Sequence, residues 1–333
     1  MPAKIHQPTP RAIRALAARL RRGGLVAIPT ETVYGLAANA LDARACRSIF
    51  RAKRRPADDP LIVHVVDLRA AESLAVFNEP ARVLVRAFWP GPLTLVLPRK
   101  SIVPAVVTSG QSTVALRSPA HPVARRLLRA AGIPLAAPSA NLFGYVSPTT
   151  AEHVLAGLGG RIDAILDGGP CRVGVESTIA TVTADGAIRV LRPGAISGAS
   201  LVQALRRAGI RGRLSREKPA RTVLAPGLLD QHYSPSTPLE VRTKIASSLT
   251  RSGEPHTAYI FRRRPRGRIR RGIFSFSRTG SAREVARHLY RVLREVDAAG
   301  FRKIVAESMP VRAGDPLAVA INDRLLRAAG RRR

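Results

Sequence analysis

Short apolar runs and amphipathic segments alternate along the first two thirds of the chain. The runs are rich in Val, Ile and Leu, which is typical of buried strands, while the segments between them repeat their apolar residues at helical spacing. The expected strands are "LVAIP", "LIVHVV", "LTLVLP", "TVALRSP", "IPLAAPSA", "AILDGG", "STIATVT" and "IRVLRPG". The expected helices are residues 11–22, 43–53, 80–88 and 122–131. This alternation predicts an α/β domain with a mixed sheet over residues 1–205.

The pattern changes after a short predicted helix at residues 200–208. Residues 206–238 are rich in Arg, Pro, Gly and Ser and have little periodicity, so they read as a linker. Strands "LEVRTK", "HTAYIFRR" and "KIVAES" then alternate with predicted helices at 282–299 and 317–329. Residues 239–333 are therefore expected to form a smaller, Rossmann-like α/β domain with a parallel sheet.

Polar side chains are concentrated where strands of the first domain end. In "VAIPTETVYGLAANAL", an apolar strand is followed at once by Thr30, Glu31, Thr32 and Tyr34. The block "GVESTIATV" repeats this arrangement of one carboxylate and two hydroxyls, and "APSANLFGYVSPT" is a loop of small hydroxyl residues. Small side chains let a ligand approach the backbone, and hydroxyls can donate to phosphate or ribose. These blocks predict a binding site for a small polar ligand.

Basic residues stand beside these polar blocks. In "AKRRPADDPLIVH", Lys53 and Arg55 lie on a proline-stiffened loop, either as a phosphate clamp or as a solvated charged loop. Arg117 lies in the otherwise apolar strand "TVALRSP". A buried arginine is costly unless it meets an anion, so a ligand carboxylate or an internal Asp or Glu is required. His64, in another apolar strand, reads by itself as a core histidine.

Composition bounds the class of protein. The 333 residues have a net charge of +33, which indicates either attraction to polyanions such as nucleotides and RNA or an arginine-rich proteome. The two cysteines, Cys46 and Cys171, are too far apart for a zinc motif and favour a reducing, cytoplasmic location. No apolar run long enough for a membrane span and no secretory signal is evident, so no membrane association is expected.

Seven blocks, taken in their order, resemble the YrdC-like threonylcarbamoyl-adenylate synthases. They are "PTETVYGL", "AKRRPADDPLIVHV", "FWPGPLTLVL", "TVALRSP", "APSANLFGYVSPT", "GVESTI" and "LRPGAI", which together span residues 11–197 almost continuously. "APGLLDQHYSP" and "LAVAINDRLLRAA" resemble the linker and the C-terminal end of the longer, two-domain members. The resemblance implies a twisted mixed-sheet domain with a basic cavity, and a linker at 206–238 that closes over the active site.

The family resemblance also implies an activity. L-threonine, bicarbonate and ATP, with Mg²⁺, would give threonylcarbamoyl-AMP and pyrophosphate in a nucleotidyltransferase reaction. The product would supply proteins that transfer threonylcarbamoyl to the tRNA adenosine next to the anticodon. The alternative is a non-catalytic RNA-binding protein that uses the basic cavity. Carbamoyl transfer of the hydrogenase-maturation type is disfavoured, because those proteins carry Cys-rich zinc fingers.

Site residues follow from the resemblance position by position. The positions that match threonine contacts are Thr32, His64, Arg117, Ala137 and Ser177. The positions that match ATP contacts are Arg55, Asp59, Thr113, Ser139, Ser147, Arg192, His232 and Tyr233. Lys53 and Arg55 match the catalytic basic motif, and no metal ligands are assigned. Asp59 stands where relatives commonly have an amide, and an acid there would repel a triphosphate unless it meets Mg²⁺ or ribose.

Overall fold

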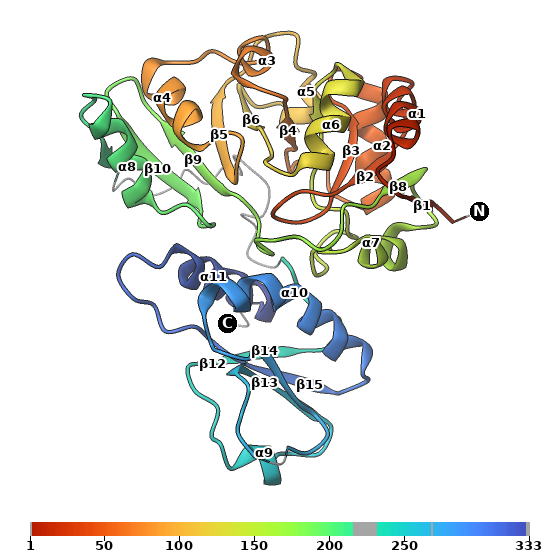
Figure 1. The fold of residues 1–333 in the computed structure, drawn as a ribbon, viewed down its shortest axis with the longest axis vertical. Helices are drawn as coiled ribbons and strands as arrows, with labels where there is room; N and C mark the ends of the chain where they lie inside the picture. Colours follow the sequence, from red (N-terminus) through yellow and green to blue (C-terminus); the bar gives the residue numbers. More distant parts are fainter. Residues whose placement is uncertain (1, 216–231, 268, 331–333) are drawn as a thin grey trace.

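The computed structural model describes residues 2–215, 232–267 and 269–330. Two sheets organise these residues into two bodies, one above the other in Figure 1. Within the described residues, no helix has the length and apolar character needed to cross a bilayer.

The first domain is built on one long mixed sheet. Its eleven strands among the described residues run in the order β1-β8-β2-β3-β7-β4-β6-β5-β9-β10-β11. The strands are β1 (Lys4–His6), β2 (Val26–Ile28), β3 (Gly35–Asn39), β4 (Ile62–His64), β5 (Leu93–Pro98), β6 (Thr113–Arg117), β7 (Leu135–Ala136), β8 (Ala164–Leu166), β9 (Thr178–Val182), β10 (Ala187–Arg192) and β11 (Arg213–Leu214). Parallel pairs such as β4 with β6 alternate with antiparallel pairs such as β5 with β6.

Helices cover this sheet on its outer faces. They are α1 (Pro10–Arg21), α2 (Ala43–Lys53), α3 (Leu68–Glu72), α4 (Glu79–Phe88), α5 (Ala105–Thr108), α6 (Pro122–Ala131), α7 (Ala151–Leu158) and α8 (Gly198–Arg207). Polar side chains cap several of them, for example Asp42 at the start of α2 and Thr9 at the start of α1. Capped helix starts of this kind fix the loops that lead into the helices.

The second domain has a four-stranded, fully parallel sheet in the order β12-β15-β13-β14. Its elements are β12 (Leu239–Arg242), α9 (Leu249–Ser252), β13 (Thr257–Arg263), β14 (Ile273–Ser277), α10 (Ala282–Ala298), β15 (Lys303–Glu307) and α11 (Pro316–Ala329). In Figure 1, α10 and α11 lie between this sheet and the first domain.

The predicted fold class is confirmed, including the mixed sheet and the smaller parallel α/β domain. The helices at 43–53 and 122–131 match their predicted bounds, and the other long helices differ from prediction by one or two residues. The short strands β1, β3, β11 and β14 were not predicted, because they are too brief or too rich in small and polar residues to stand out. Strand β11 falls within the predicted linker, and residues 216–231 of that linker lie outside the described residues.

The two domains share one hydrophobic cluster. Val33, Val146 and Val175 of the first domain pack in the same cluster as Ala286 and Leu289 of α10. Gly174, beside Val175, has a φ of +83°, and a Cβ built there would lie 2.3 Å from the carbonyl oxygen of Ala286. Only glycine therefore allows the backbones of the two domains to approach this closely.

We predict that Gly174→Ala weakens the contact between the domains more than Gly144→Ala does. Both glycines have a left-handed φ, but nothing lies within 4 Å of a Cβ built at Gly144. The shared conformational cost is about 1–2 kcal/mol. The clash with α10 adds ~1–3 kcal/mol at Gly174 alone. Thermal and urea unfolding of the two variants measures the difference, and equal destabilisation would contradict the assigned contact.

Candidate active site

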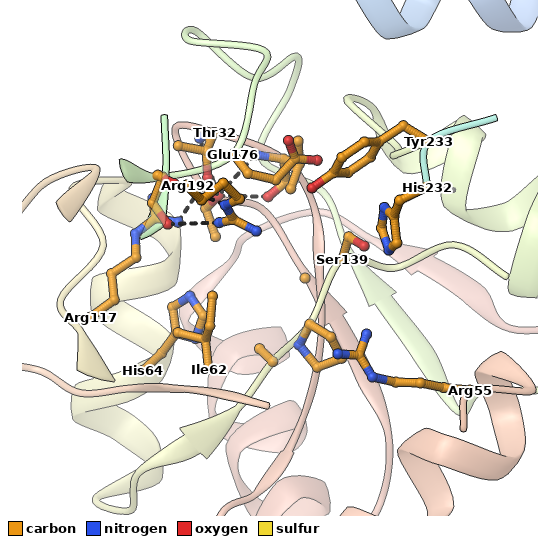
Figure 2. A pocket seen from close by; sticks show the side chains of 16 residues that line it. Thr32, Arg55, Ile62, His64, Arg117, Ser139, Glu176, Arg192, His232 and Tyr233 are labelled. Carbon is orange, nitrogen blue, oxygen red and sulfur yellow. Dashed lines mark hydrogen bonds between the residues drawn. The ribbon is translucent and has the colours of Figure 1, made fainter. Parts of the chain in front are cut away.

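One cavity lies where the strand ends and loops of the first domain meet the described residues that precede the second domain. It has a volume of about 490 Å³, including its opening to solvent. Its lining residues are Thr30, Thr32, Val33, Gly35, Arg55, Ile62, His64, Arg117, Ala137, Pro138, Ser139, Glu176, Ser177, Arg192, His232 and Tyr233. Figure 2 shows Arg117 and His64 on one side of this cavity, with Arg55 and His232 on the other.

The turn between β2 and β3 forms one wall. Thr30 Oγ1 accepts hydrogen bonds from the backbone N–H groups of Thr32 and Val33, each at 3.2 Å, and donates to the Val33 carbonyl at 2.6 Å. The Tyr34 hydroxyl donates to the carbonyl of Gly169 at 2.9 Å, which fixes the turn to the loop after β8. The dense polar residues of this turn therefore serve first to hold its own shape and leave Thr32 facing the cavity.

Arg117, at the end of β6, is paired inside the protein. Its Nη2 lies 2.7 Å from Oε1 of Glu31, and its Nη1 donates to Thr32 Oγ1 at 2.9 Å. Burial acts to raise the pKa of Glu31, but the charge and hydrogen bond of Arg117 outweigh it and the pKa is lowered. Of the two anions that the sequence allowed for Arg117, the structure has the internal carboxylate in place.

Arg55 has a carboxylate of its own. Its Nη2 lies 2.8 Å from Oδ1 of Asp59, and both side chains are almost fully buried. The same guanidinium donates to the carbonyls of Asp59 and Pro60. Burial lowers the pKa of Arg55 and raises that of Asp59, while each charge opposes the shift of the other. Asp59 is thus a partner of Arg55 rather than a second lining group of the cavity.

Lys53 lies beneath the wall of the cavity. Its Nζ donates to the carbonyl oxygens of Ser139 and Asn141, both at 2.5 Å. Burial, together with the charge of Arg55, lowers the pKa of this ammonium well below its ordinary value. In this geometry Lys53 positions the loop that follows β7, which presents Ser139 to the cavity.

The start of β9 and the end of β10 meet at the opposite wall of the cavity. Arg192 donates from Nε to the carbonyl of Ser177 and from Nη2 to its hydroxyl, both at 3.2 Å. The Ser177 hydroxyl also lies 2.7 Å from Oγ1 of Thr94. A Cβ at Gly194 would lie 2.3 Å from the backbone nitrogen of Thr178, so these two segments contact each other at backbone distance. That contact holds Arg192 and Ser177 in one place.

Glu176 is the carboxylate of the lining itself. It accepts hydrogen bonds from Ser147 at 2.7 Å, from Tyr290 at 2.8 Å and from Nε of Arg324 at 2.8 Å. Burial acts to raise its pKa, but the charges of Arg324 and Arg192 outweigh this and lower it to about 2. Glu176 is therefore ionised at neutral pH, and two of its partners come from the second domain.

Two buried histidines remain neutral. Burial, aided by the charge of Arg117, lowers the pKa of His64 to about 3. Burial, aided by the charge of Arg55, lowers the pKa of His232 to about 3. The Nδ1 of His64 has no hydrogen-bond partner within the described part of the chain. A buried acceptor or donor of this kind is available to a ligand.

Most of the predicted site residues come together in this cavity. The lining includes Thr32, Arg55, His64, Arg117, Ala137, Ser139, Ser177, Arg192, His232 and Tyr233. Asp59, Lys53 and Ser147 lie behind the lining and contact it through Arg55, Ser139 and Glu176. Thr113 starts β6, opposite Pro98, and is not among the lining residues. The individual ligand assignments stay predictions.

Sequence reasoning placed Glu176 in a polar block of the predicted site but assigned it no partner, and it did not single out Tyr290 or Arg324. A signal for Arg324 was present: it falls on the same helical face as the apolar Ile321, Leu325 and Ala328. An arginine on the buried face of a helix must find an anion. The anion that Arg324 meets depends on how the two domains pack, and the hydrophobic periodicity of one helix does not predict that packing.

Known proteins share this fold and sequence over nearly the whole chain. Residues 18–194 match the Sua5/YciO/YrdC family model, described as "Telomere recombination", and residues 196–330 match "Threonylcarbamoyl-AMP synthase, C-terminal domain". The chain is 40% identical over 333 residues to the threonylcarbamoyl-AMP synthase of Pyrococcus abyssi, covering 96% of this chain and 94% of that one. It is also 40% identical to the Bacillus subtilis enzyme of the same name, covering 96% and 93%.

A solved structure agrees with these matches. The crystal structure of P. abyssi Sua5 complexed with L-threonine superposes with a TM-score of 0.84 at 37% identity, covering 98% of this chain and 97% of that one. The fold and cavity thus define a two-domain protein of the YrdC type. The chain belongs to the threonylcarbamoyl-AMP synthase family, in its two-domain form.

We predict that His64 makes stability depend on pH between about 6.5 and about 3. Its pKa is depressed in the folded state, so below pH 6.5 the unfolded chain takes up a proton that the folded chain does not. Stability therefore falls as the pH falls, by up to about 1.4 kcal/mol per pH unit. His64→Asn should show a shallower fall in Tm from pH 7 to pH 4, whereas a substitution of the exposed His256 should retain the wild-type slope. Equal slopes for wild type and His64→Asn would refute the prediction.

Proposed function

We propose that this protein is an L-threonylcarbamoyladenylate synthase that makes threonylcarbamoyl-AMP and pyrophosphate from L-threonine, bicarbonate and ATP. The observation that carries the proposal is a single cavity in which the predicted threonine contacts and the predicted nucleotide contacts face one another (Figure 2). Membership of the family over nearly the full chain supports the same activity.

Threonine would bind on the side of Arg117. The amino acid's carboxylate would share the guanidinium that Glu31 now occupies, while Thr32 already orients Nη1. A bidentate guanidinium fits a carboxylate well, since two parallel N–H groups can meet two oxygens. His64 is neutral at pH 7, so it adds no positive charge that would repel the threonine ammonium as the amino acid binds.

The chemistry requires two successive bond formations. The deprotonated threonine amine attacks the carbon of bicarbonate, which loses water, or of CO₂ derived from it, with release of one amine proton to solvent, and gives a carbamate. A carbamate oxygen then attacks the α-phosphorus of ATP, and the bond to pyrophosphate breaks. Negative charge grows on the α-phosphate and the leaving group, so buried cations aimed at them lower the barrier. Arg55 and Arg192 supply that charge in the cavity lining, and Lys53 holds the adjoining loop.

Magnesium would enter as part of the ATP complex. No group of three metal-ligating side chains occurs in the described ranges of the chain. The carboxylates near the cavity, Glu31, Asp59 and Glu176, are each paired with an arginine. Mg²⁺ would therefore arrive bound to the phosphates of ATP, and it would supply positive charge near the leaving group when bound.

The product determines the partners. Threonylcarbamoyl-AMP is a mixed anhydride that hydrolyses readily, so downstream tRNA threonylcarbamoyl transferase proteins would consume it in the cytoplasm. The net charge of +33 is also compatible with direct tRNA or RNA binding. Pyrophosphate release that requires both threonine and bicarbonate distinguishes the enzyme from a non-catalytic RNA-binding protein, for which RNA binding would need no substrate.

We predict that Lys53→Ala and Arg55→Ala each abolish formation of threonylcarbamoyl-AMP while the protein remains folded. Loss of one preorganised charge from a buried site typically lowers the rate by about 10²–10³-fold. Threonine- and bicarbonate-dependent pyrophosphate release measures the activity, and circular dichroism checks the fold. Arg51→Ala, on the exposed face of α2, is the control that should retain full activity. Full activity in both test variants would refute the assignment.

We predict that Asp59→Asn strengthens ATP binding by about 3–10-fold and lowers stability. The amide leaves the guanidinium of Arg55 without its buried counter-charge, so a triphosphate gains a partner while the folded protein without ligand loses one. Calorimetric titration with Mg-ATP and thermal unfolding measure the two effects. Asp58→Asn is the matched control, because Asp58 is the exposed neighbour. A tenfold weaker binding would instead indicate that Asp59 contacts Mg²⁺ or ribose directly.

A further inference from the structure

The second domain reaches the wall of the cavity through one buried arginine. Arg324 of α11 is 1% exposed, and its Nε donates to Oε2 of Glu176 at 2.8 Å. Its Nη2 donates to the carbonyl of Pro193 at 2.9 Å. Glu176 lines the cavity, and Pro193 directly follows Arg192, which also lines it. A single guanidinium of the second domain thus fixes two segments of the first domain that carry lining residues.

A second helix contacts the same carboxylate. The hydroxyl of Tyr290, on α10, donates to Oε2 of Glu176 at 2.8 Å and to Oε1 at 3.1 Å. Ser147, from the first domain, donates to Oε1 at 2.7 Å. Oε1 therefore accepts from both domains and Oε2 accepts from the second domain, which leaves the carboxylate one orientation. A buried charged network is rigid when all of its members are satisfied, as Glu176 is here.

Arg324 and Tyr290 also hold Tyr233. This residue has a φ of +66°, a left-handed conformation that is strained for a side chain with a Cβ. Its ring stacks on Tyr290 at 5.8 Å between centroids, and the guanidinium of Arg324 lies 5.4 Å from its centroid. The backbone N–H of His232 donates to the carbonyl of Arg327 in α11 at 3.4 Å. A strained backbone persists where its surroundings fix it. Here the second domain holds the ring of Tyr233 and the backbone of His232, while the first domain holds Ser234, whose N–H donates to the carbonyl of Gly144 at 2.8 Å.

We propose that Arg324 is a positioning residue of the catalytic site, and that with Tyr290 it makes the second domain a structural part of the nucleotide side of the cavity. The proposal rests on the proposed synthase function. Arg324 acts through Glu176 and Tyr233 and touches no substrate itself.

The contacts of Glu176 predict which substrate depends on Arg324. Glu176 interacts electrostatically with Arg192 as well as with Arg324. Without Arg324, the unbalanced carboxylate would be drawn toward Arg192, where it would compete with a phosphate for the same charge. On the threonine side, Thr32, Arg117 and Glu31 have their own network, and none of its hydrogen bonds or ion pairs described above involves Arg324. Ser177, which follows Glu176 and accepts from Arg192, is the predicted threonine contact that lies next to the network of Arg324. Loss of Arg324 should therefore affect ATP and threonine unequally.

Steady-state kinetics of the full chain tests this inequality. We expect Arg324→Gln to raise the KM for ATP by ~10-fold or more, with the KM for threonine changed by less than about 3-fold. Arg324→Lys should recover part of the loss, because a cation remains. The double variant Glu176→Gln/Arg324→Gln removes both members of the ion pair, and Asp323, the other carboxylate on Arg324, keeps Arg327 as a partner. The KM for ATP should therefore lie closer to wild type than in Arg324→Gln alone. Arg291→Gln, an exposed arginine on α10, is the control.

A milder variant keeps the test valid if Arg324→Gln fails to fold. Tyr290→Phe removes only the hydroxyl that donates to Glu176 and keeps the ring that stacks on Tyr233. It should raise the KM for ATP by about 3-fold with little change for threonine. Folded Arg324→Lys and Tyr290→Phe variants with wild-type KM for ATP would overturn the positioning role, as would a loss that falls equally on both substrates.

The two proposals fail in different ways. If the wild-type chain releases no pyrophosphate with ATP, threonine and bicarbonate, the synthase function is wrong and the positioning role is wrong with it. If the wild type is active and the variants leave the KM for ATP unchanged, the synthase function stands and only the role of Arg324 is refuted.

Discussion

Three of the arginines buried around the cavity each lie against a carboxylate. Arg117 is paired with Glu31, Arg55 with Asp59 and Arg324 with Glu176, at 2.7 to 2.8 Å. Removal of one partner would leave a buried charge uncompensated, at a cost of about 3–5 kcal/mol. The walls of the cavity are therefore fixed by electrostatic necessity, because each strand end or helix must lie where its charge meets its partner.

These pairs also shape what the cavity can bind. An anionic ligand that approaches Arg117 or Arg55 meets a guanidinium already oriented by a carboxylate and by backbone or hydroxyl groups. The ligand exchanges partners with an internal anion, so its binding energy is offset by the pair it disturbs. In return the cations need no reorganisation when charge develops in the reaction. The internal carboxylates thus weaken substrate binding but keep the arginines oriented for the reaction.

The same constraint explains why two domains form one site. Glu176 belongs to the first domain, but two of its partners, Arg324 and Tyr290, belong to the second. Apolar packing brings the domains together through Val33, Val146 and Val175, and glycine at position 174 lets α10 approach. The hydrophobic contact stabilises the association of the two domains, and the buried ion pair between Arg324 and Glu176 fixes their relative position. The second domain is in this way coupled to the lining of the cavity.

The sequence by itself determined the fold class and the chemistry of the lining. Periodicity placed the long helices and strands, and the polar blocks at strand ends predicted a site for a small polar ligand. The resemblance to the YrdC-like synthases then identified ten residues that line the cavity. The sequence also required an anion beside Arg117, because the apolar residues around it show that its strand is buried and a buried arginine needs a counter-charge. The tertiary structure alone decided that this anion is Glu31, that Asp59 pairs with Arg55, and that Lys53 holds a loop. It alone brought Arg324 to Glu176, 148 residues away in the chain. Local patterns show that a charge will be buried, but its partner is chosen by packing between distant segments.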